Sequence, residues 1–297
     1  MRPPAWSHDR KCFYKYMTAK TARAVLENSM LRWALPKLFN DPFDVQFDLQ
    51  VKYDRDRVVE CALNNIIDLY MGRRHVSSGN KLADGVKLLR TMAPGLQEAD
   101  LRDKFRKSMY EGMENAERNM PKTHAEMRAV LAELKLLCFS EVYDNLLMWA
   151  HYGENHTGAV LEFSCIEKFD SAWGAAKPVR YRENMPTLVD EHKLVKLLSG
   201  EGTIATPELF EEAVFVKAED WQHEKEWRLV GGWEKEQATE YIPFEPEEMT
   251  AVYLGCRVSD ADRAAIKKIA ADKYPHASVY NGSKSATRFA VDFSKAA

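Results

Sequence analysis

Long apolar runs, a secretory leader and a strong excess of one charge are all missing from this sequence. No apolar run approaches the roughly 18 residues that cross a membrane. The first thirty residues hold Arg2, Arg10, Lys11 and Lys15 where a leader would be apolar. Lys and Arg number 42 against 45 Asp and Glu, which argues against a general polyanion binder and leaves a local basic patch open. These absences predict a cytoplasmic protein that does not bind membranes.

Paired cysteines are missing as well. The five cysteines are scattered and no two stand in a C-x-x-C spacing, which argues against a disulfide framework and a zinc knuckle. We expect reduced thiols. A metal set built from Cys138, His151, His156 and Cys165 lacks the close ligand pair of a structural zinc site, so no metal is predicted.

Several common catalytic motifs are also absent. The sequence contains no G-x-x-x-x-G-K-[ST], no G-x-G-x-x-G after a strand, no H-E-x-x-H and no G-x-S-x-G. These absences argue against P-loop, Rossmann, zinc-protease and α/β-hydrolase chemistry.

What is present is enough apolar sequence for a sizeable core, since 45% of the residues are hydrophobic and 11% are aromatic. The middle stretch, 54–135, has apolar residues at helical spacing, from Val58 to Tyr70 and again from Leu101 to Met113. Strands and helices in the remainder do not alternate regularly, which favours an α+β fold over a doubly wound one. We predict one α+β domain over 1–297 with a helical insertion at 54–135.

Short strands and helices are expected on both sides of this insertion. A strand should begin at Cys12, and a helix capped by Thr18 or Thr21 should end at Asn28. Further strands are predicted at Leu136–Ser140, Ala159–Phe163, Val179–Arg182, Glu226–Val230, Ala251–Leu254 and Ala277–Tyr280, and helices at Leu188–Leu198, Pro207–Val216 and Asp260–Tyr274.

The segment from Cys138 to Phe163 is rich in side chains that carry chemistry. A strand ending in Ser140 precedes a short helix that presents Trp149, His151 and Tyr152. These three offer a stacking face, a titratable imidazole and a hydroxyl. The competing interpretation is that the aromatics belong to the core and His151 is structural.

A second segment, Trp221 to Val230, holds two carboxylates and a guanidinium. On a strand, Glu224, Glu226 and Arg228 would project from one face, where they suit acid–base work or the binding of a ribose. An ion-paired strand edge is the competing interpretation.

Two shorter features lie near the N-terminus. Asn40-Asp41-Pro42-Phe43 suits an ordered turn, and Lys15 stands between Tyr14 and Tyr16 on the first strand. A simple turn and a surface lysine are the competing interpretations.

Six short motifs follow one another along the chain: Tyr14-Lys15-Tyr16, Phe39-Asn40-Asp41-Pro42-Phe43, Cys138-Phe139-Ser140, Trp149-Ala150-His151-Tyr152, Gly158, and Trp221 with His223, Glu224, Glu226 and Arg228. This ordered set, which spans roughly 13–231, resembles the bacterial "domain of unknown function 2971" family. A weaker resemblance, in the first strand and helix, is to ADP-ribosyltransferase-like domains.

The second resemblance implies NAD as a possible co-substrate, bound in a cleft between two small mixed or antiparallel sheets. It implies that Lys15 or Tyr16 takes the place of the first-strand histidine, Ser140 the second place and Glu226 the third. Glu226 would then bind the ribose and stabilise an oxocarbenium-like cation, and Glu224 would orient or deprotonate the acceptor.

The same resemblance implies roles for the remaining candidates. Tyr16 or Trp149 would stack on nicotinamide, Asn40 or Arg228 would meet phosphate, and Tyr152 would also bind the nucleotide. His151 joins Glu224, Glu226 and Ser140 as a candidate catalytic residue.

Three functions therefore remain in competition. The first is an NAD-using ADP-ribosyltransferase or NAD glycohydrolase, of the toxin or defence type, with an unidentified protein or nucleic-acid acceptor. The second is a non-catalytic nucleotide- or nucleic-acid-binding regulatory module on the same scaffold. The third is a nuclease or other hydrolase that uses His151.

Overall fold

The computed structural model describes residues 3–46, 50–77, 79–202, 206–232 and 237–296. The chain divides into two compact units. The first comprises 1–46, 132–183 and 215–297, and the second comprises 47–131 and 184–214. The fold is a mixture of helices and strands, so the predicted α+β class is confirmed.

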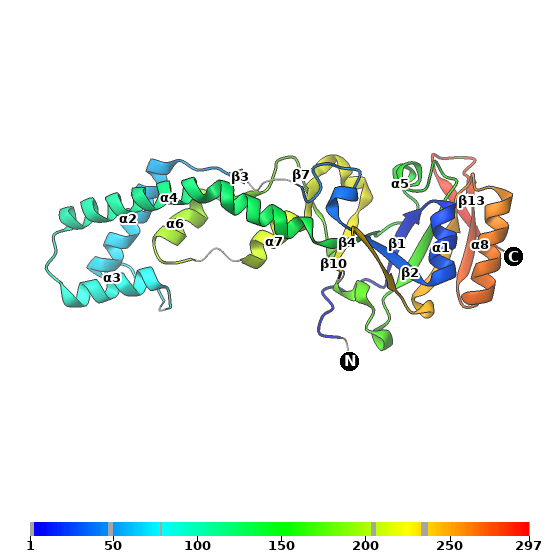
Figure 1. Ribbon diagram of the computed structural model, residues 1–297, viewed down its shortest axis with the longest axis horizontal. Helices are drawn as coiled ribbons and strands as arrows, with labels where there is room; N and C mark the ends of the chain where they lie inside the picture. Colours follow the sequence, from blue (N-terminus) through cyan, green and yellow to red (C-terminus); the bar gives the residue numbers. More distant parts are fainter. Residues whose placement is uncertain (1–2, 47–49, 78, 203–205, 233–236, 297) are drawn as a thin grey trace. The chain divides into compact units, whose positions relative to one another are not determined.

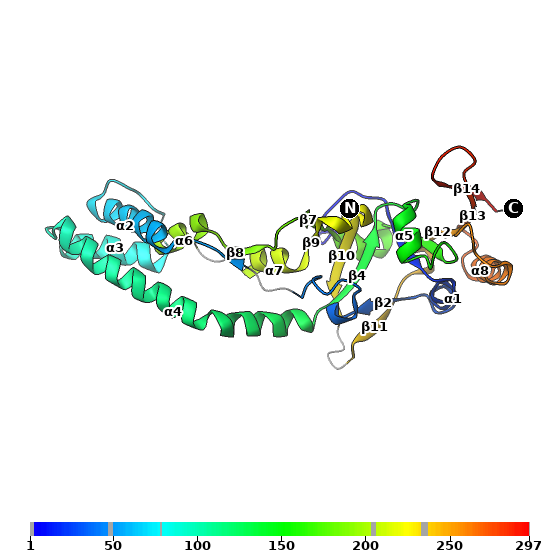
Figure 2. The same ribbon diagram turned by 90° about the horizontal axis from the view of Figure 1, so that it is seen from above.

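The first unit is built on one large mixed sheet (Figures 1 and 2). Among the described residues the sheet has ten strands. Its main path runs in the order β11-β2-β4-β1-β5-β12-β13-β14, and β10 pairs with both β4 and β6. The strands are β1 (Cys12–Met17), β2 (Met30–Ala34), β4 (Lys135–Ser140), β5 (Ala159–Ser164), β6 (Lys177–Pro178), β10 (Glu226–Gly231), β11 (Thr239–Pro243), β12 (Met249–Leu254), β13 (Ser278–Lys284) and β14 (Val291–Lys295).

This sheet differs from the expected pair of small sheets. The smaller sheets in the described part of the chain have only two strands each: β7 (Arg180–Arg182) with β9 (Val216–Ala218), and β3 (Gln50–Val51) with β8 (Thr187–Val189). The single large sheet arises because β4 pairs along its whole length with β10, while one residue at each of its ends also pairs with β1 or β2. Pairings between segments so distant in the sequence leave no local pattern.

The predicted strands and helices are largely confirmed. Helix α1 (Ala19–Asn28) begins at Thr18, whose side chain accepts a hydrogen bond from the Thr21 backbone N–H, and it ends at Ser29 in the left-handed region. It lies beside α8 (Asp260–Lys273) in both views (Figures 1 and 2). The Ser29 and Tyr274 hydroxyls, which flank the C-terminal ends of these two helices, are 2.8 Å apart.

Alternation along the strands gives each face of the sheet its own core. Phe13 and Met17 of β1 pack in the larger cluster with α1 and α8. Tyr16 points to the opposite face, where it packs with Trp149 of α5 (Leu146–His151) and Tyr253 of β12. Period-two alternation on a half-buried strand predicts this division.

Short helical turns complete the first unit. They are η1 (Pro36–Leu38), η2 (Glu167–Phe169), η3 (Ala172–Ala175), η4 (Glu219–Glu224) and η5 (Pro246–Glu248).

The second unit is mainly helical. It contains α2 (Arg55–Met71), α3 (Lys81–Met92), nearly all of α4 (Glu98–Ala132), α6 (Glu191–Leu198) and α7 (Thr206–Val214). Its core is formed by the predicted stripe of α2, including Val58, Ile66 and Tyr70, packed with Val86 of α3 and Leu101 of α4. The predicted helical stretch 54–135 therefore lies almost wholly in this unit, which also contains 184–214. No helix among the described residues is both long and apolar enough to cross a membrane.

Candidate functional site

A buried network of charged side chains lies in the first unit. Glu226 and Arg228 stand on β10, two residues apart and therefore on one face of the strand. The Arg228 Nε donates to Glu226 Oε1 at 2.7 Å, and the Arg228 guanidinium also lies 2.7 Å from the carboxylate of Asp44. Arg228 is completely buried, so this arginine can remain charged only because carboxylates surround it.

Lys217 of β9 joins the same network. Its Nζ lies 2.5 Å from Glu224 Oε2, 3.1 Å from Glu226 Oε2 and 3.4 Å from Asp44. One ammonium therefore contacts all three carboxylates. We call Asp44, Lys217, Glu224, Glu226 and Arg228 the ionic cluster.

Glu224 reaches the cluster from a different element than the sequence suggested. It is the last residue of η4, and Lys225, with φ of 45°, ends that turn in the left-handed region. The strand begins only at Glu226, so strand alternation does not include Glu224. The turn nevertheless brings the Glu224 carboxylate to the same cations as Glu226.

Hydrogen bonds from neighbouring elements fix the backbone around Glu224. The Ser140 hydroxyl, at the end of β4, donates to the Glu224 carbonyl at 2.7 Å. Asn145, which caps α5, donates from Nδ2 to the His223 carbonyl at 3.0 Å. The structure therefore makes Ser140 a residue that positions the backbone of Glu224.

The two glutamates differ sharply in acidity. Burial and, after it, the nearby charge of Glu226 together raise the pKa of Glu224 to about 7, against the opposing effect of Lys217. Burial also opposes ionisation of Glu226, but Arg228 and Lys217 together hold its pKa well below the usual value. A pair of carboxyl groups with pKa values pushed apart is a common basis for acid–base chemistry.

Charge balance favours a proton on one of the three carboxyl groups of the cluster, and burial raises the pKa of both Glu224 and Asp44. Asp44, Glu224 and Glu226 face two permanent cations, Lys217 and Arg228. Burial disfavours the Lys217 ammonium, but Glu226, Asp44 and Glu224 raise the pKa of Lys217 above its ordinary value. A proton on Glu224 removes the excess negative charge from a poorly solvated site.

Tyr152 and Asn40 connect the ionic cluster to the surface. The Tyr152 hydroxyl donates to Glu224 Oε1 at 2.6 Å, and Asn40 Nδ2 donates to the Tyr152 oxygen at 3.1 Å. Tyr152 is half-buried and Asn40 is exposed. The turn that follows Asn40 is fixed by Asp41, whose carboxylate accepts from the Phe43 N–H at 2.9 Å.

Three rings lie beside this connection. The exposed His151 ring is 6.2 Å from Trp221 and 6.4 Å from His223, and the Trp221 and His223 rings are 6.0 Å apart. The Lys217 Nζ lies 5.0 Å from the Trp221 ring centroid. Because Trp221 and His223 are only half-buried, they offer aromatic surface next to the buried carboxylates.

The structure thus brings most of the predicted residues together. Glu224, Glu226, Arg228, Tyr152 and Asn40 are joined by hydrogen bonds. The Ser140 hydroxyl donates to the backbone carbonyl of Glu224. The charges of Glu226 and Glu224 raise the pKa of Lys15, against the larger effect of burial.

Trp149 and Tyr16 lie elsewhere, in the aromatic core. Trp149 is fully buried and its Nε1 donates to the Tyr143 carbonyl at 2.8 Å. The Tyr16 hydroxyl donates to the Val142 carbonyl at 3.0 Å, and its ring packs edge-on against Trp149 at 5.5 Å. A ligand ring would reach either side chain only if this packing opened.

Sequence reasoning missed Asp44 and Lys217. Lys217 follows Val214-Phe215-Val216, an apolar run that also suits a strand, but the helix predicted through Val216 placed the lysine at a helix end. Asp44 is one residue beyond the turn motif that ends at Phe43. Neither position carries a signal that predicts its partners, which are contributed by β10 and η4.

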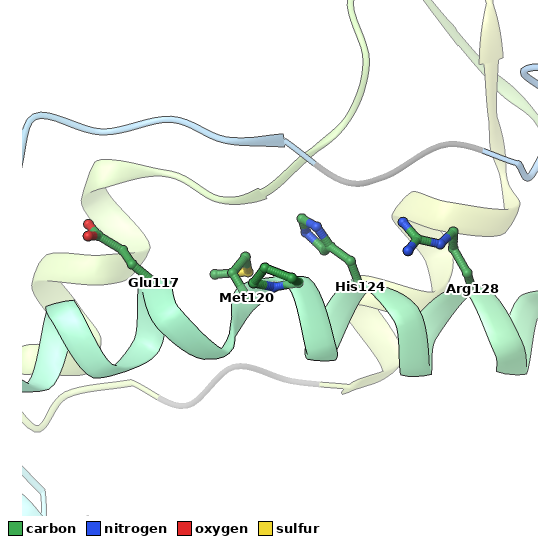
Figure 3. Close-up of a pocket in the computed structure, with 5 residues that line it drawn as sticks. Glu117, Met120, His124 and Arg128 are labelled. Carbon is green, nitrogen blue, oxygen red and sulfur yellow. The ribbon is translucent and has the colours of Figure 1, made fainter.

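No group of three or more His, Cys, Asp or Glu side chains suited to a metal ion occurs among the described residues. A hollow of about 410 Å³ lies on α4 in the second unit, lined by Glu117, Met120, Pro121, His124 and Arg128 (Figure 3). The four labelled side chains project from one side of the helix. None of the predicted site residues lies there, and the Glu117 carboxylate already accepts from the Tyr53 hydroxyl at 2.6 Å.

Comparison with known proteins gives a partial match. Residues 148–229 match the sequence model of a family described as "Protein of unknown function (DUF2971)". The matched region contains Tyr152, Lys217, Glu224, Glu226 and Arg228, and therefore most of the ionic cluster. No match was found among curated proteins or among solved structures.

Proposed function

We propose that the protein transfers or hydrolyses the ribosyl group of NAD, with Glu224 as the acid–base residue. The observation that carries this proposal is the pair of buried carboxyl groups on η4 and β10, of which one is ionised and the other has a pKa of about 7. A group that titrates near neutral pH is suited to take up and release a proton during turnover.

The proposed reaction gives the two glutamates different tasks. The bond between ribose and nicotinamide breaks, and its electron pair leaves with nicotinamide. Water or an acceptor then attacks the oxocarbenium-like ribosyl cation, and ionised Glu224 takes the proton that this nucleophile loses. Arg228 and Lys217 hold Glu226 in its ionised form, so we assign Glu226 to fixing the charge beside Glu224 and not to contact with the ribose.

The half-buried rings next to Glu224 support binding of a planar group. Trp221 and His223 lie close to the exposed His151, whose ring is 6.5 Å from that of Tyr152, the residue that donates to Glu224. Nicotinamide stacked on such rings would lie near the carboxyl group that titrates.

The test is to incubate the purified full chain with NAD and to follow nicotinamide release and label transfer. We expect turnover by the native protein and a loss of 100-fold or more in Glu224→Gln, on the order of magnitude usual for an acid–base group. Glu219→Gln is the matched control, because Glu219 lies on the same turn but is exposed. Absence of nicotinamide release from the native protein would contradict the proposal.

One observation favours the non-catalytic alternative. Each oxygen of Glu224 and Glu226 already accepts a hydrogen bond from a protein group, as expected for a cluster that only holds a binding scaffold in shape. A thermal shift on addition of NAD, without release of nicotinamide, would favour this second function.

A further inference from the structure

Strand β4 has two different neighbours along one of its edges. At its end Ser140 pairs with Tyr14 of β1, and near its start Leu136 pairs with Ala34 of β2. Between these two points β1 and β2 diverge, and in the described part of the chain Cys138 has a strand partner only in β10, at Arg228. We call this opening between β1 and β2 the fork.

The ammonium group of Lys15 lies in the fork. Its Nζ donates to the Cys138 carbonyl at 2.5 Å, where a third strand would otherwise supply the donor. Burial lowers the pKa of Lys15, Glu226 opposes this effect and the positive charge of Arg32 adds to it. Lys15 therefore lies within electrostatic reach of both the ionic cluster and a second cation, Arg32 of β2.

Arg32 belongs to an uncovered face of the β2–β11 ribbon. Its cross-strand partner is Tyr241, so the two side chains project to the same side. Arg32 is exposed, and Tyr241 is 61% exposed. The opposite face, with Leu31 and Trp33, is packed into the core.

These cations lack the carboxylates that surround cations elsewhere in the protein. Within the described ranges, neither Lys15 nor Arg32 has an ion-pair partner closer than 4.0 Å. The same-side neighbours of Arg32 across the ribbon are Tyr241, Thr239 and Pro243, none of which is acidic. The two acids whose charges act on Lys15, Glu226 and Glu224, already contact Lys217. Lys15 and Arg32, which form no ion pair among the described residues, complement an anion, and the exposed ring of Tyr241 complements a planar group on that anion.

We infer that the fork and the uncovered face of β2–β11 form a phosphate-binding subsite for a nucleoside diphosphate, in which Lys15 and Arg32 hold the phosphates and Tyr241 stacks on the base. A phosphate accepts charge-assisted hydrogen bonds from both cations, and an exposed aromatic side chain stacks on any base. Lys15 places the phosphates toward Glu226 and Glu224. The inference rests on the proposed function in one respect, since it locates the phosphate end of the same substrate.

The test measures binding of ADP, adenosine and inorganic phosphate to the purified full chain by calorimetry, beside the NAD turnover assay. Arg32→Gln and Tyr241→Ser alter exposed side chains, so both variants should fold, which circular dichroism verifies. Arg257→Gln is the control, because Arg257 is an exposed arginine outside the fork. We expect ADP to bind more tightly than adenosine or phosphate, and each of the two variants to weaken ADP binding about tenfold, with no change in the control.

The outcomes separate this subsite from the catalytic proposal. ADP binding that weakens in Arg32→Gln supports the subsite even if no nicotinamide is released. Nicotinamide release with the same KM for NAD in Arg32→Gln, Tyr241→Ser and the native protein would overturn the subsite while leaving the catalytic proposal intact. Absence of ADP binding by the native protein, or equal weakening in Arg257→Gln, would also overturn it.

Discussion

Ion pairs in the two compact units use the same residue types in opposite surroundings. In the helical unit Arg106 pairs with Glu60 at 2.9 Å, with 41% and 48% of the two side chains exposed. In the first unit Arg228 pairs with Glu226 at 2.7 Å, with 0% and 6% exposed. Water screens the first pair and scarcely reaches the second.

The difference shows that buried charges indicate a functional site better than charges at the surface do. A surface pair contributes about 0–1 kcal/mol. A buried cluster must neutralise itself, and it does so by moving pKa values in opposite directions. The pKa of Glu224 is therefore the property of this protein that is most closely linked to chemistry.

The largest expected effect follows from removing the buried arginine. Arg228→Met should destabilise the protein by about 3–5 kcal/mol, because Asp44 and Glu226 lose a partner inside the fold. Chemical denaturation at pH 7 measures this loss. Arg106→Met in the helical unit should cost less than about 1 kcal/mol, and equal losses in the two variants would remove the contrast between the units.

The next effect is a dependence of stability on pH. The pKa of Glu224 is about 7 in the folded protein against an ordinary 4.5, so between these values the folded state holds a proton that the unfolded chain has released. This contribution is complete below about pH 4.5 and falls as the pH rises through 7, by roughly 3 kcal/mol.

Denaturation of the native protein and of Glu224→Gln between pH 5 and 8 isolates the contribution of Glu224 and its coupled neighbours, because groups outside the ionic cluster titrate equally in both. We expect the free energy of unfolding of the native protein to fall, relative to that of Glu224→Gln, as the pH rises. Parallel curves would mean that Glu224 has an ordinary pKa.

A smaller effect is expected from the hydroxyl of Tyr152. Tyr152→Phe removes the 2.6 Å hydrogen bond to Glu224, which stabilises the ionised carboxylate and lowers its pKa. The variant should lose about 1–2 kcal/mol at pH 8, and the pKa of Glu224 should rise. Tyr241→Phe, which removes an exposed hydroxyl, should leave both quantities unchanged.

The smallest effect belongs to the helical unit. A double-mutant cycle on Arg106 and Glu60 should give a coupling of about 0.5 kcal/mol or less, and it should vanish in 1 M salt. The corresponding coupling between Arg228 and Glu226 should persist in salt. A large, salt-resistant coupling for the helical pair would contradict the comparison.

Local patterns predicted much of the fold. Strands near 136–140, 226–230 and 251–254 follow from short, largely apolar runs, and the Thr18 cap fixes the start of α1. The sequence alone predicts that Glu226 and Arg228 lie on the same face of a strand, because residues two apart on a strand share a face.

The remaining features depend on contacts that no local pattern encodes. The single large sheet arises from β10 pairing along β4, and Asp44 meets Arg228 from a position 184 residues earlier in the chain. The role of Lys217 was missed because the predicted helix ran to Val216, two residues beyond the last residue of α7, Val214. The strand that carries Lys217 was therefore not predicted. The fork at Lys15 likewise becomes visible only when three strands are placed side by side.

The account depends most directly on the acidity of Glu224. Carboxyl carbons of glutamate labelled with ¹³C can be followed by NMR as the full chain is titrated from pH 4 to 9, with Glu224→Gln and Glu226→Gln used to assign the two signals. We predict that the Glu224 signal titrates near pH 7 and that the Glu226 signal remains that of an ionised carboxylate throughout the range. Titration of Glu224 at an ordinary pKa near 4.5 would contradict the account.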